Sequence, residues 1–258
     1  MPIKSYKEAI NEAIAQEMKK DENVILIGED VAGGAGTNGE QDAWGGVMGV
    51  TKGLLGQFGR ERIIDTPITE TAILGMASGA ALTGLRPIAE LMFVDFMGVC
   101  FDQILNQTAK FRYMFGGKAI TPLTIRTMYG GGVRAASQHS QCLYPIFTHV
   151  PGIKVVIPSG PYEAKGLLIK SIRDNDPVIF LEHKAMYDVT EDVPDESYTI
   201  PFGEANFTRE GKDITLIGMG KTVSLCNNAS DLLKKDGVHA TVLDLRTLSP
   251  LDEDTILE

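Results

Sequence analysis

A carboxylate at the start of a predicted helix is the strongest local indication of chemistry in this sequence. The segment Asp65–Glu70 (DTPITE) is typical of a strand that Pro67 ends, followed by a helix whose first turn contains Glu70. In that turn a carboxylate faces the positive end of the helix dipole and free backbone N–H groups. Taken alone, the pattern is explained by an ordinary helix-terminal carboxylate, so a catalytic role must be argued from the surrounding sequence.

A histidine after a glycine-rich loop is the second candidate. His139 lies in the segment Ala136–Gln141 (ASQHSQ), where a helix is predicted to begin after the glycines at 130–132. An imidazole ionises near neutral pH and serves as a hydrogen-bond partner or a proton carrier. A solvent-facing loop histidine is the alternative. We interpret the remaining histidines as structural or surface residues: His149, His183 and His239.

Composition excludes several classes of function. The 258 residues carry a formal net charge of -10 and contain no run of Lys or Arg, which argues against nucleic acid and anionic membranes as partners. No signal peptide is recognisable, and the most apolar stretches are too short and interrupted to span a bilayer. Three widely spaced cysteines fit neither a metal site nor a secreted disulfide framework, so we expect a cytoplasmic protein with reduced thiols at Cys100, Cys142 and Cys226.

The N-terminal residues predict a helix and then a buried strand. Ser5 and Glu8 form a capping box, and the strand is expected at Val24–Gly28. A Gly-rich loop with Trp44 in its middle follows, from Glu29 to about residue 50. It is long for a connector, so we expect it to be functional or interfacial. The predicted helix presents one apolar stripe: Tyr6, Ile10, Ala13, Ile14 and Met18.

Strand and helix signals then alternate along the chain. The predicted helix Thr69–Thr83 is rich in small residues, and Gly75 and Gly79 leave one of its faces bare for the close approach of a neighbour, with Gly84 as the expected C-cap. Apolar strands that alternate with helices indicate an α/β fold with a mostly parallel sheet covered on both faces. Further strands are predicted at 62–65, 86–92, 121–127, 154–159 and 177–183, and helices near 101–114 and at 161–173.

The last quarter of the sequence predicts a second unit. Residues 1–185 are expected to form the first domain, and residues 186–212, rich in Asp, Glu, Pro and Thr, a linker. Residues 213–258 predict a strand, a helix, a strand and the start of a further helix. Since two strands and one complete helix cannot bury a core of their own, we interpret this second domain as truncated.

Several long motifs in one order resemble a known family. They are Gly84–Pro87 (GLRP), Met92 with Phe96, Phe101–Gly117 (FDQILNQTAKFRYMFGG) and Ala136–Gln141. From about Ile3 to Leu257, the series is similar to the β subunits of the thiamine-dependent decarboxylating component of 2-oxo acid dehydrogenase complexes. The loop Gly28–Leu54 and the stretch Glu90–Gln107 resemble the acetoin dehydrogenase branch of this family more than the pyruvate branch.

The resemblance implies a three-layer αβα thiamine-diphosphate-binding fold, with a transketolase-like pyrimidine-binding domain and the start of a transketolase C-terminal-like domain. It matches Glu70 to the glutamate that hydrogen-bonds the aminopyrimidine ring, where burial of a carboxyl group favours a shared proton. Met92 and Phe96 match positions that pack on that ring, although ordinary core packing is their alternative. His139 matches a histidine at the substrate mouth, and Glu29 a carboxylate in an acidic passage between paired sites.

A potassium site is also implied, formed mainly by backbone carbonyls. Hard oxygen ligands suit an alkali cation, and carbonyls supply them whatever the side chain. A plain helix-to-strand turn explains the same segment equally well. The matched positions are Leu123, Ser171, Ile172, Asp174 and Asp176.

One expected motif is missing. Thiamine enzymes bind Mg²⁺ and the diphosphate through a GDG sequence followed by Asn, and this chain contains no GDG. The resemblance therefore implies that thiamine diphosphate is shared with an α subunit that holds the Mg²⁺, most simply in an α2β2 heterotetramer. The expected reaction is cleavage of acetoin to acetaldehyde, with the acetyl unit passed to a lipoyl-bearing acyltransferase core. Two alternatives stay open: pyruvate or a branched-chain 2-oxo acid as substrate, or a non-catalytic scaffold subunit.

Overall fold

The chain begins with a short strand and a capped helix. A computed structural model describes residues 2–32 and 45–258; Trp44 and most of its loop lie outside this range. After β1 (Ile3–Ser5), α1 (Tyr6–Lys20) starts at the predicted capping box, in which the Glu8 N–H donates to Ser5 Oγ at 3.3 Å and the Ser5 N–H donates to the Glu8 carboxylate at 2.7 Å. The whole predicted apolar stripe is buried, which confirms this part of the prediction.

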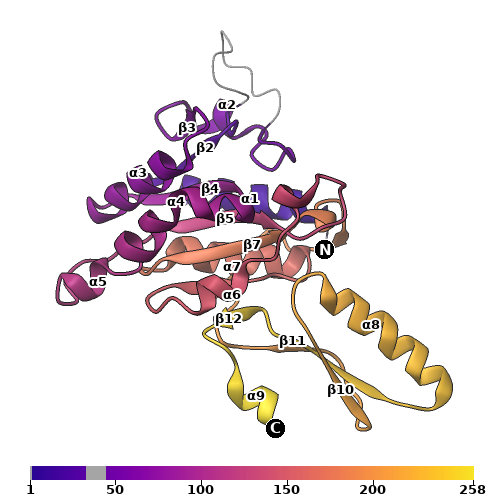
Figure 1. Ribbon diagram of the computed structural model, residues 1–258. Coiled ribbons are helices and arrows are strands. Elements are labelled where there is room, and N and C mark those ends of the chain that lie inside the picture. The colour runs from indigo at the N-terminus through magenta and orange to yellow at the C-terminus, as the bar shows by residue number, and fades with distance from the viewer. Residues whose placement is uncertain (1, 33–44) are drawn as a thin grey trace.

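A seven-stranded sheet forms the centre of the molecule (Figure 1), in the order β12-β6-β7-β5-β4-β2-β3. Every neighbouring pair is parallel except β12 with β6. The predicted mostly parallel sheet is therefore confirmed. Its strands are β2 (Val24–Glu29), β3 (Ile63–Thr66), β4 (Arg86–Phe93), β5 (Thr124–Tyr129), β6 (Lys154–Val156), β7 (Val178–His183) and β12 (Thr247–Ser249).

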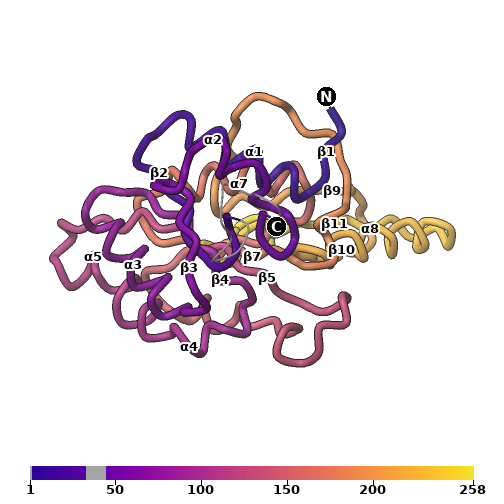
Figure 2. Tube along the Cα trace, turned by 90° about the horizontal axis from the view of Figure 1, so that it is seen from above, coloured from indigo at the N-terminus to yellow at the C-terminus, as the bar shows by residue number. Residues whose placement is uncertain are grey.

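Helices cover both faces of this sheet, so the fold has three layers (Figure 2). On one face α1 packs against α7 (Pro161–Arg173) over a core that includes Leu26, Ile88 and Phe180. On the other face α3 (Glu70–Leu82) and α4 (Met97–Asp102) cover Ile27, Ala89 and Leu181. The shorter helices are α2 (Leu54–Phe58), α5 (Phe111–Met114), α6 (Tyr144–Thr148) and the π-helical segment η2 (Gln103–Thr108).

Several details differ from the prediction. The helix expected near 101–114 is divided into α4, η2 and α5, β5 starts at Thr124 and β6 ends at Val156. Helix α3 ends at Leu82, Thr83 is its C-cap, and Gly84 follows with a φ of +106°, so the glycine stands one residue beyond the cap. The expected linker 186–212 contains regular structure, because β8 (Thr190–Asp192) pairs with β1 and β9 (Asn206–Arg209) joins the second sheet. Its composition alone suggested a plain connector. The domain limits themselves remain a prediction.

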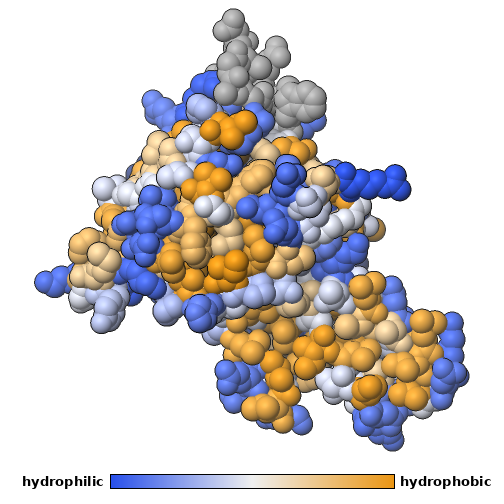
Figure 3. Space-filling model, viewed as in Figure 1, coloured by the Kyte–Doolittle hydropathy of each residue, from blue (hydrophilic) through white to orange (hydrophobic). Residues whose placement is uncertain are grey.

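The C-terminal residues form a three-stranded sheet in the order β10-β11-β9, built from β10 (Ile214–Gly218), β11 (Ala240–Asp244) and β9. Helix α8 (Thr222–Leu233) packs on β10 and β11, and α9 (Glu253–Leu257) follows. Figure 3 shows apolar side chains gathered over this lower lobe. The exposed apolar residues in these elements are Phe207, Ile214, Ile217, Leu225, Leu232 and Leu257.

The second unit is tied to the first through buried charge. Asp244, at the end of β11, is fully buried and accepts a hydrogen bond from the Ser159 hydroxyl of the first unit. Burial raises the pKa of Asp244 to about 6, although the Ser159 hydrogen bond opposes this shift. Arg246 donates to Glu163 of α7 at 2.9 Å. The strand β12 then returns to pair with β6.

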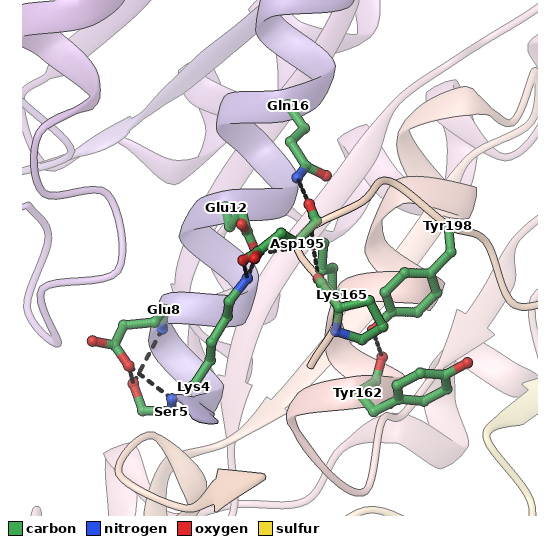
Figure 4. Close-up of polar contacts among 10 residues, drawn as sticks. Lys4, Ser5, Glu8, Glu12, Gln16, Tyr162, Lys165, Asp195 and Tyr198 are labelled. Atoms are coloured by element: carbon green, nitrogen blue, oxygen red, sulfur yellow. Dashed lines mark hydrogen bonds and ion pairs between the residues drawn. The ribbon is translucent and has the colours of Figure 1, made fainter. Parts of the chain in front are cut away.

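A buried lysine joins α1, α7 and the segment that leaves the first sheet (Figure 4). Lys165 of α7 has no solvent exposure, and its ammonium group donates to Glu12 at 2.9 Å and to the Asp195 carbonyl at 3.1 Å. It also donates to the Pro194 carbonyl and lies 5.5 Å from the centroid of the Tyr198 ring. All of its hydrogen-bonding capacity is used, which is the condition for tolerating a buried charge. Within the described ranges, no helix combines the length and hydropathy required to cross a membrane.

We predict that Lys165→Ala lowers the free energy of unfolding by about 3 kcal/mol, because the Glu12 carboxylate and two part-buried carbonyls lose their donor. Chemical denaturation measures this change. Lys7→Ala is the matched control, since Lys7 pairs with Asp188 at an exposed position and such pairs contribute less than about 1 kcal/mol. Equal losses for both variants would contradict the role given to Lys165.

A second prediction concerns Asp244. Its folded-state pKa of about 6 exceeds the ordinary value of 3.8, so the folded state binds the extra proton and the wild type loses stability as the pH rises from about 4 to 6. Asp244→Asn removes this dependence. We expect the variant to gain about 3 kcal/mol relative to the wild type between pH 4 and pH 7, measured by denaturant unfolding. The exposed control Asp254→Asn should follow the wild type at both pH values.

Candidate functional site

The parallel register of the sheet brings several polar and aromatic side chains to one edge. Strands β2, β3, β4, β5 and β7 all run in the same direction, so their carboxyl ends meet there. Glu29 ends β2 and is in register with Thr66, the last residue of β3. At or just after the ends of these strands lie Glu29, Glu70, Phe93, Tyr129, His183 and Lys184.

The carboxylates of Glu29 and Glu70 lie at this edge and interact electrostatically. Glu70 is the first residue of α3 and is partly exposed, and the side chain of its N-cap, Thr69, makes no capping hydrogen bond. The carboxylate of Glu70 therefore stands in the first turn, as predicted. Burial raises the pKa of Glu29, and the neighbouring charges of Asp30, Glu70 and Asp65 raise it further. The two predicted glutamates, Glu29 and Glu70, are thus brought close enough to influence each other.

A β-bulge at the end of β4 builds the apolar side of the edge. In the ladder with β5, Leu91 pairs with Thr127 and Phe93 with Met128, which leaves Met92 as the extra residue. Met92 and Phe93 consequently pack in the same cluster, whereas Leu91 faces the opposite core. Phe96 follows on the short helix η1 (Val94–Phe96), with its ring 5.6 Å from that of Phe93. We call Met92, Phe93 and Phe96 the apolar shelf.

His139 rests on this shelf. Its ring lies 4.7 Å from that of Phe93 and 5.3 Å from that of Phe96, in both cases edge to face. The histidine belongs to η3 (Ser137–His139), and the loop behind it is fixed to η1 because Gln141 Nε2 donates to Asp95 at 2.8 Å. His139 Nδ1 is buried and has no hydrogen-bond partner within the described part of the chain. This ring atom can therefore serve a group that comes from outside the chain.

Two residues at this edge escape prediction from the sequence, Phe93 and Lys184. Strict alternation along β4 would turn Phe93 toward the face of Leu91, and the bulge reverses this. Lys184 directly follows β7 and is 2% exposed, and its ammonium nitrogen lies 5.2 Å from the centroid of the Phe93 ring. Among the described residues this nitrogen has no hydrogen-bond partner. Burial lowers its pKa, while Asp95 and Cys142 act in the opposite direction.

Behind the shelf lies a buried ion cluster. Arg126 of β5 donates to both carboxylate oxygens of Glu182, at 2.6 and 2.8 Å, and to Glu90 at 2.9 Å. Tyr187 donates its hydroxyl hydrogen to Glu182 at 2.7 Å. Burial raises the pKa of Glu90 against the effect of Arg126. An adjoining cavity of about 10 Å³, lined by Met92 among others, has room for one water molecule.

The residues of the expected potassium site lie together at the opposite edge of the sheet, at the amino ends of β5 and β7. The carbonyls of Ile172 and Asp174 both accept hydrogen bonds from the Arg86 guanidinium group, at 3.2 and 3.0 Å. The Ser171 carbonyl accepts the Asp174 N–H at 3.2 Å, and the Leu123 carbonyl accepts the Val178 N–H at 2.9 Å. These carbonyls therefore already have protein donors, although each oxygen keeps a second lone pair.

The carboxylates of this turn also have partners. Asp174 accepts from Lys154 at 2.6 Å and from the Asp176 N–H at 2.9 Å, and Asp176 pairs with Arg112 at 2.5 Å. Over residues 2–32 and 45–258, no group of three or more His, Cys, Asp or Glu residues is arranged to hold a metal ion. A cation at this turn would depend on backbone oxygens.

The structure is consistent with structural or surface roles for the other three histidines and with reduced thiols at the three cysteines. His149 and His239 are exposed, and the three cysteines are free. His183 is half-buried, and burial, with Lys221 and Lys184 nearby, lowers its pKa to about 4. Gly130, with a φ of +84°, packs on its imidazole so closely that a Cβ atom would stand 2.5 Å from Nε2. His183 is therefore a neutral packing residue at neutral pH.

Comparison with protein families gives two matches. Residues 4–190 match the pyrimidine binding domain of transketolase, and residues 203–258 match the transketolase C-terminal domain. Among solved structures, a chain described as a split gene transketolase, inactive beta4 tetramer, superposes with a TM-score of 0.77 at 20% identity, covering 98% of this chain and 75% of that chain. At this identity the likeness concerns the fold.

Comparison with characterised proteins is more specific. The chain is 63% identical to the acetoin:2,6-dichlorophenolindophenol oxidoreductase subunit beta of Cupriavidus necator, over 98% of this chain and 75% of the relative. It is 60% identical to the protein of the same description from Bacillus subtilis, over 98% and 74%. The 2-oxoisovalerate dehydrogenase subunit beta of Bacillus subtilis is 46% identical, over 100% and 76%.

Proposed function

Because this chain belongs to the transketolase-like family of thiamine-diphosphate-dependent dehydrogenase β subunits, we propose that it is the β subunit of an enzyme that cleaves acetoin. The acetyl unit is then passed to a lipoyl group of an acyltransferase core, and acetaldehyde leaves. The acetoin-specific relatives at 60–63% identity support this substrate over the 2-oxo acids of the relatives at 46–47%.

The observation that carries the proposal is the meeting of Glu70, the apolar shelf and His139 at one edge of the sheet. A flat pyrimidine ring fits against Met92 and the aromatic side chains, since a thioether and aromatic edges pack well on a π-system. Glu70 offers a carboxylate at the same edge of the sheet, in the first turn of α3. The unpartnered His139 Nδ1 offers a further polar contact. The residues present thus suit the pyrimidine half of thiamine diphosphate.

Thiamine diphosphate, when bound, supplies the electron sink for breaking the bond next to the substrate carbonyl. The chain's own contribution is to orient the ring and to move protons. Glu70 would hydrogen-bond a pyrimidine ring nitrogen and could exchange a proton with it, because a carboxyl group can both donate and accept a proton. Burial, with the nearby charges of Asp30 and Glu70, raises the pKa of Glu29, so Glu29 takes up a proton more readily than an isolated glutamate. His139 holds the substrate oxygen at the mouth.

The diphosphate and its Mg²⁺ are proposed to bind on an α subunit. This is supported by the absence of a GDG sequence from the chain. An extensive partner interface is supported by exposed apolar side chains on and beside α3 and α4: Ile68, Met76, Leu82 and Val99. On α3, a Cβ atom added to Gly79 would meet nothing within 4 Å, so this bare face is open to a neighbour. An α2β2 heterotetramer bound to the lipoyl-bearing core is the simplest assembly.

We also propose a potassium ion at the turn formed by residues 171–176 with Leu123. Its distance from the catalytic edge assigns it a structural role. Arg86 competes for the same carbonyls, so the ion must share the Ile172 and Asp174 oxygens with a guanidinium group. A cytoplasmic location is supported by the three free thiols.

Glu70→Gln tests the catalytic assignment in the complex reconstituted with its α subunit. We expect kcat for acetoin to fall at least a hundredfold, because an amide cannot exchange the proton. Glu70→Asp should also fall, since its carboxylate is one methylene short. Glu61→Gln is the control at an exposed glutamate. A fully active Glu70→Gln complex would identify the chain as a non-catalytic scaffold. A wild-type complex that turns over pyruvate but not acetoin would refute acetoin as the substrate.

Exchange of K⁺ for tetramethylammonium tests the potassium proposal. A cation that binds the folded state alone at a free concentration c stabilises it by RT ln(1 + c/Kd), which is about 2.7 kcal/mol at a hundredfold excess over Kd. We therefore expect the thermal midpoint of the complex to fall by a few degrees without K⁺ and to recover when it returns. An unchanged midpoint would mean that the protein's own cations, Arg86, Arg112 and Lys154, supply all the positive charge at this turn.

A further inference from the structure

Lys184 has a buried ammonium group that the proposed mechanism does not use. Its side chain is buried, and neither a hydrogen bond nor an ion pair of its ammonium group is found among the described residues. Burying an unpaired charge is costly, so such a group is retained where it has another use. Lys165 provides the contrast within the same chain, since its ammonium group has three hydrogen-bond acceptors.

The nearest opposite charge does not resolve the problem. Asp95 influences Lys184 electrostatically, but it spends one carboxylate oxygen on Gln141, and its other oxygen is buried without a partner. Neither the ammonium group nor this oxygen has a hydrogen-bond partner among residues 2–32 and 45–258, so both are available to a polar group beyond these residues. They lie beneath the loop that carries His139, at the entrance of the proposed site.

Phe93 covers this cation. The Lys184 nitrogen lies over the Phe93 ring at 5.2 Å from its centroid, within the range of a cation–π contact. The same ring contacts His139 and Phe96, so it is part of the wall of the proposed substrate mouth. The β4 bulge is what turns Phe93 into this position. A substrate on the apolar shelf therefore contacts the Phe93 ring and not the Lys184 ammonium group behind it.

The charge of the substrate gives this arrangement a consequence. Acetoin is a neutral hydroxyketone, whereas pyruvate and branched 2-oxo acids carry a carboxylate. A carboxylate that enters an apolar mouth loses its hydration and requires a cation in return, whereas a hydroxyketone does not. Specificity arises as much from withholding a favourable contact from the wrong ligand as from offering one to the right ligand.

Building on the proposed function, we infer that Phe93 and Lys184 form a substrate-selecting pair: the ring shields the ammonium group, so the site accepts a neutral hydroxyketone and disfavours an anionic 2-oxo acid. Removing the ring uncovers a cation that is already in place. Phe93 is thus a specificity residue of the mouth, and Lys184 is the latent carboxylate contact that it hides.

The test measures kcat/KM for pyruvate in the complex reconstituted with the α subunit. Phe93→Ala should raise this value at least tenfold over the wild type, because the carboxylate gains access to Lys184. The double variant Phe93→Ala/Lys184→Met should lose that gain and return to within about twofold of the wild-type value. Phe93→Leu keeps an apolar cover and should show no gain. An unchanged pyruvate value in Phe93→Ala, or an equal gain in the double variant, would overturn the inference.

Lys170→Met is the matched control for the lysine. Lys170 also lies over a phenylalanine ring, 5.6 Å from the centroid of Phe202, but it belongs to the last turn of α7, away from the mouth. Combined with Phe93→Ala, it should leave the pyruvate gain intact. Because the primary readout is pyruvate turnover, the inference is judged separately from the substrate proposal, which fails if the wild-type complex does not turn over acetoin.

Thermal unfolding gives a readout that needs no turnover. Lys184→Met removes a buried charge that has no partner among the described residues and keeps most of the side-chain volume, so the midpoint of the complex should rise by about 2–4 °C. A lowered or unchanged midpoint would show that the ammonium group has an acceptor in the assembled protein. Lys184 would then be unavailable to a substrate, and the inference would be wrong.

Discussion

The parallel register of β3, β2, β4, β5 and β7 is the constraint on which the rest of the molecule depends. Each of these strands delivers its last residue to the same edge, so groups that are far apart in the sequence become neighbours. Glu29 and Thr66 are directly paired, and α3 starts four residues beyond Thr66. A one-residue slip in any ladder would turn the edge residues of that strand to the other face of the sheet. The core on both faces makes such a slip costly, because side chains that fit one core would be moved into the other.

Buried charge is used in two ways in this framework. Arg126 and Lys165 are surrounded by acceptors and fix the positions of strands, helices and the chain segment that leaves the first sheet. Lys184 and one oxygen of Asp95 have no such partners in the part of the chain that the structure describes, and they lie next to the proposed site. Groups with satisfied hydrogen bonds stabilise the scaffold, whereas unsatisfied ones mark the place where a ligand or another subunit is expected.

Local sequence signals predicted the regular elements well. These elements depend on short-range patterns: the capping box at Ser5, the stripe along α1, the helix from Pro161 to Arg173 and the alternation of strands and helices along the chain. Glu70 could be predicted because a strand, a proline and a helix start determine its position locally.

Phe93 and Lys184 could not be predicted in the same way. The position of Phe93 depends on a bulge that exists only when β4 pairs with β5, and the isolation of the Lys184 ammonium group depends on every element around it. β9 was hidden for a similar reason, since a short polar segment becomes a strand only beside β11. The roles of the site residues rest on the resemblance to a family, because no spacing in the sequence defines a thiamine pocket.

The antiparallel pairing of β12 with β6 has an effect beyond joining the two units. Without it, β6 would be the outermost strand of the main sheet and would present unused N–H and C=O groups to other molecules. Such an edge invites the strands of another copy and is a common starting point for aggregation. The three-residue strand β12 pairs with β6 and so protects this edge of the main sheet from pairing with other molecules.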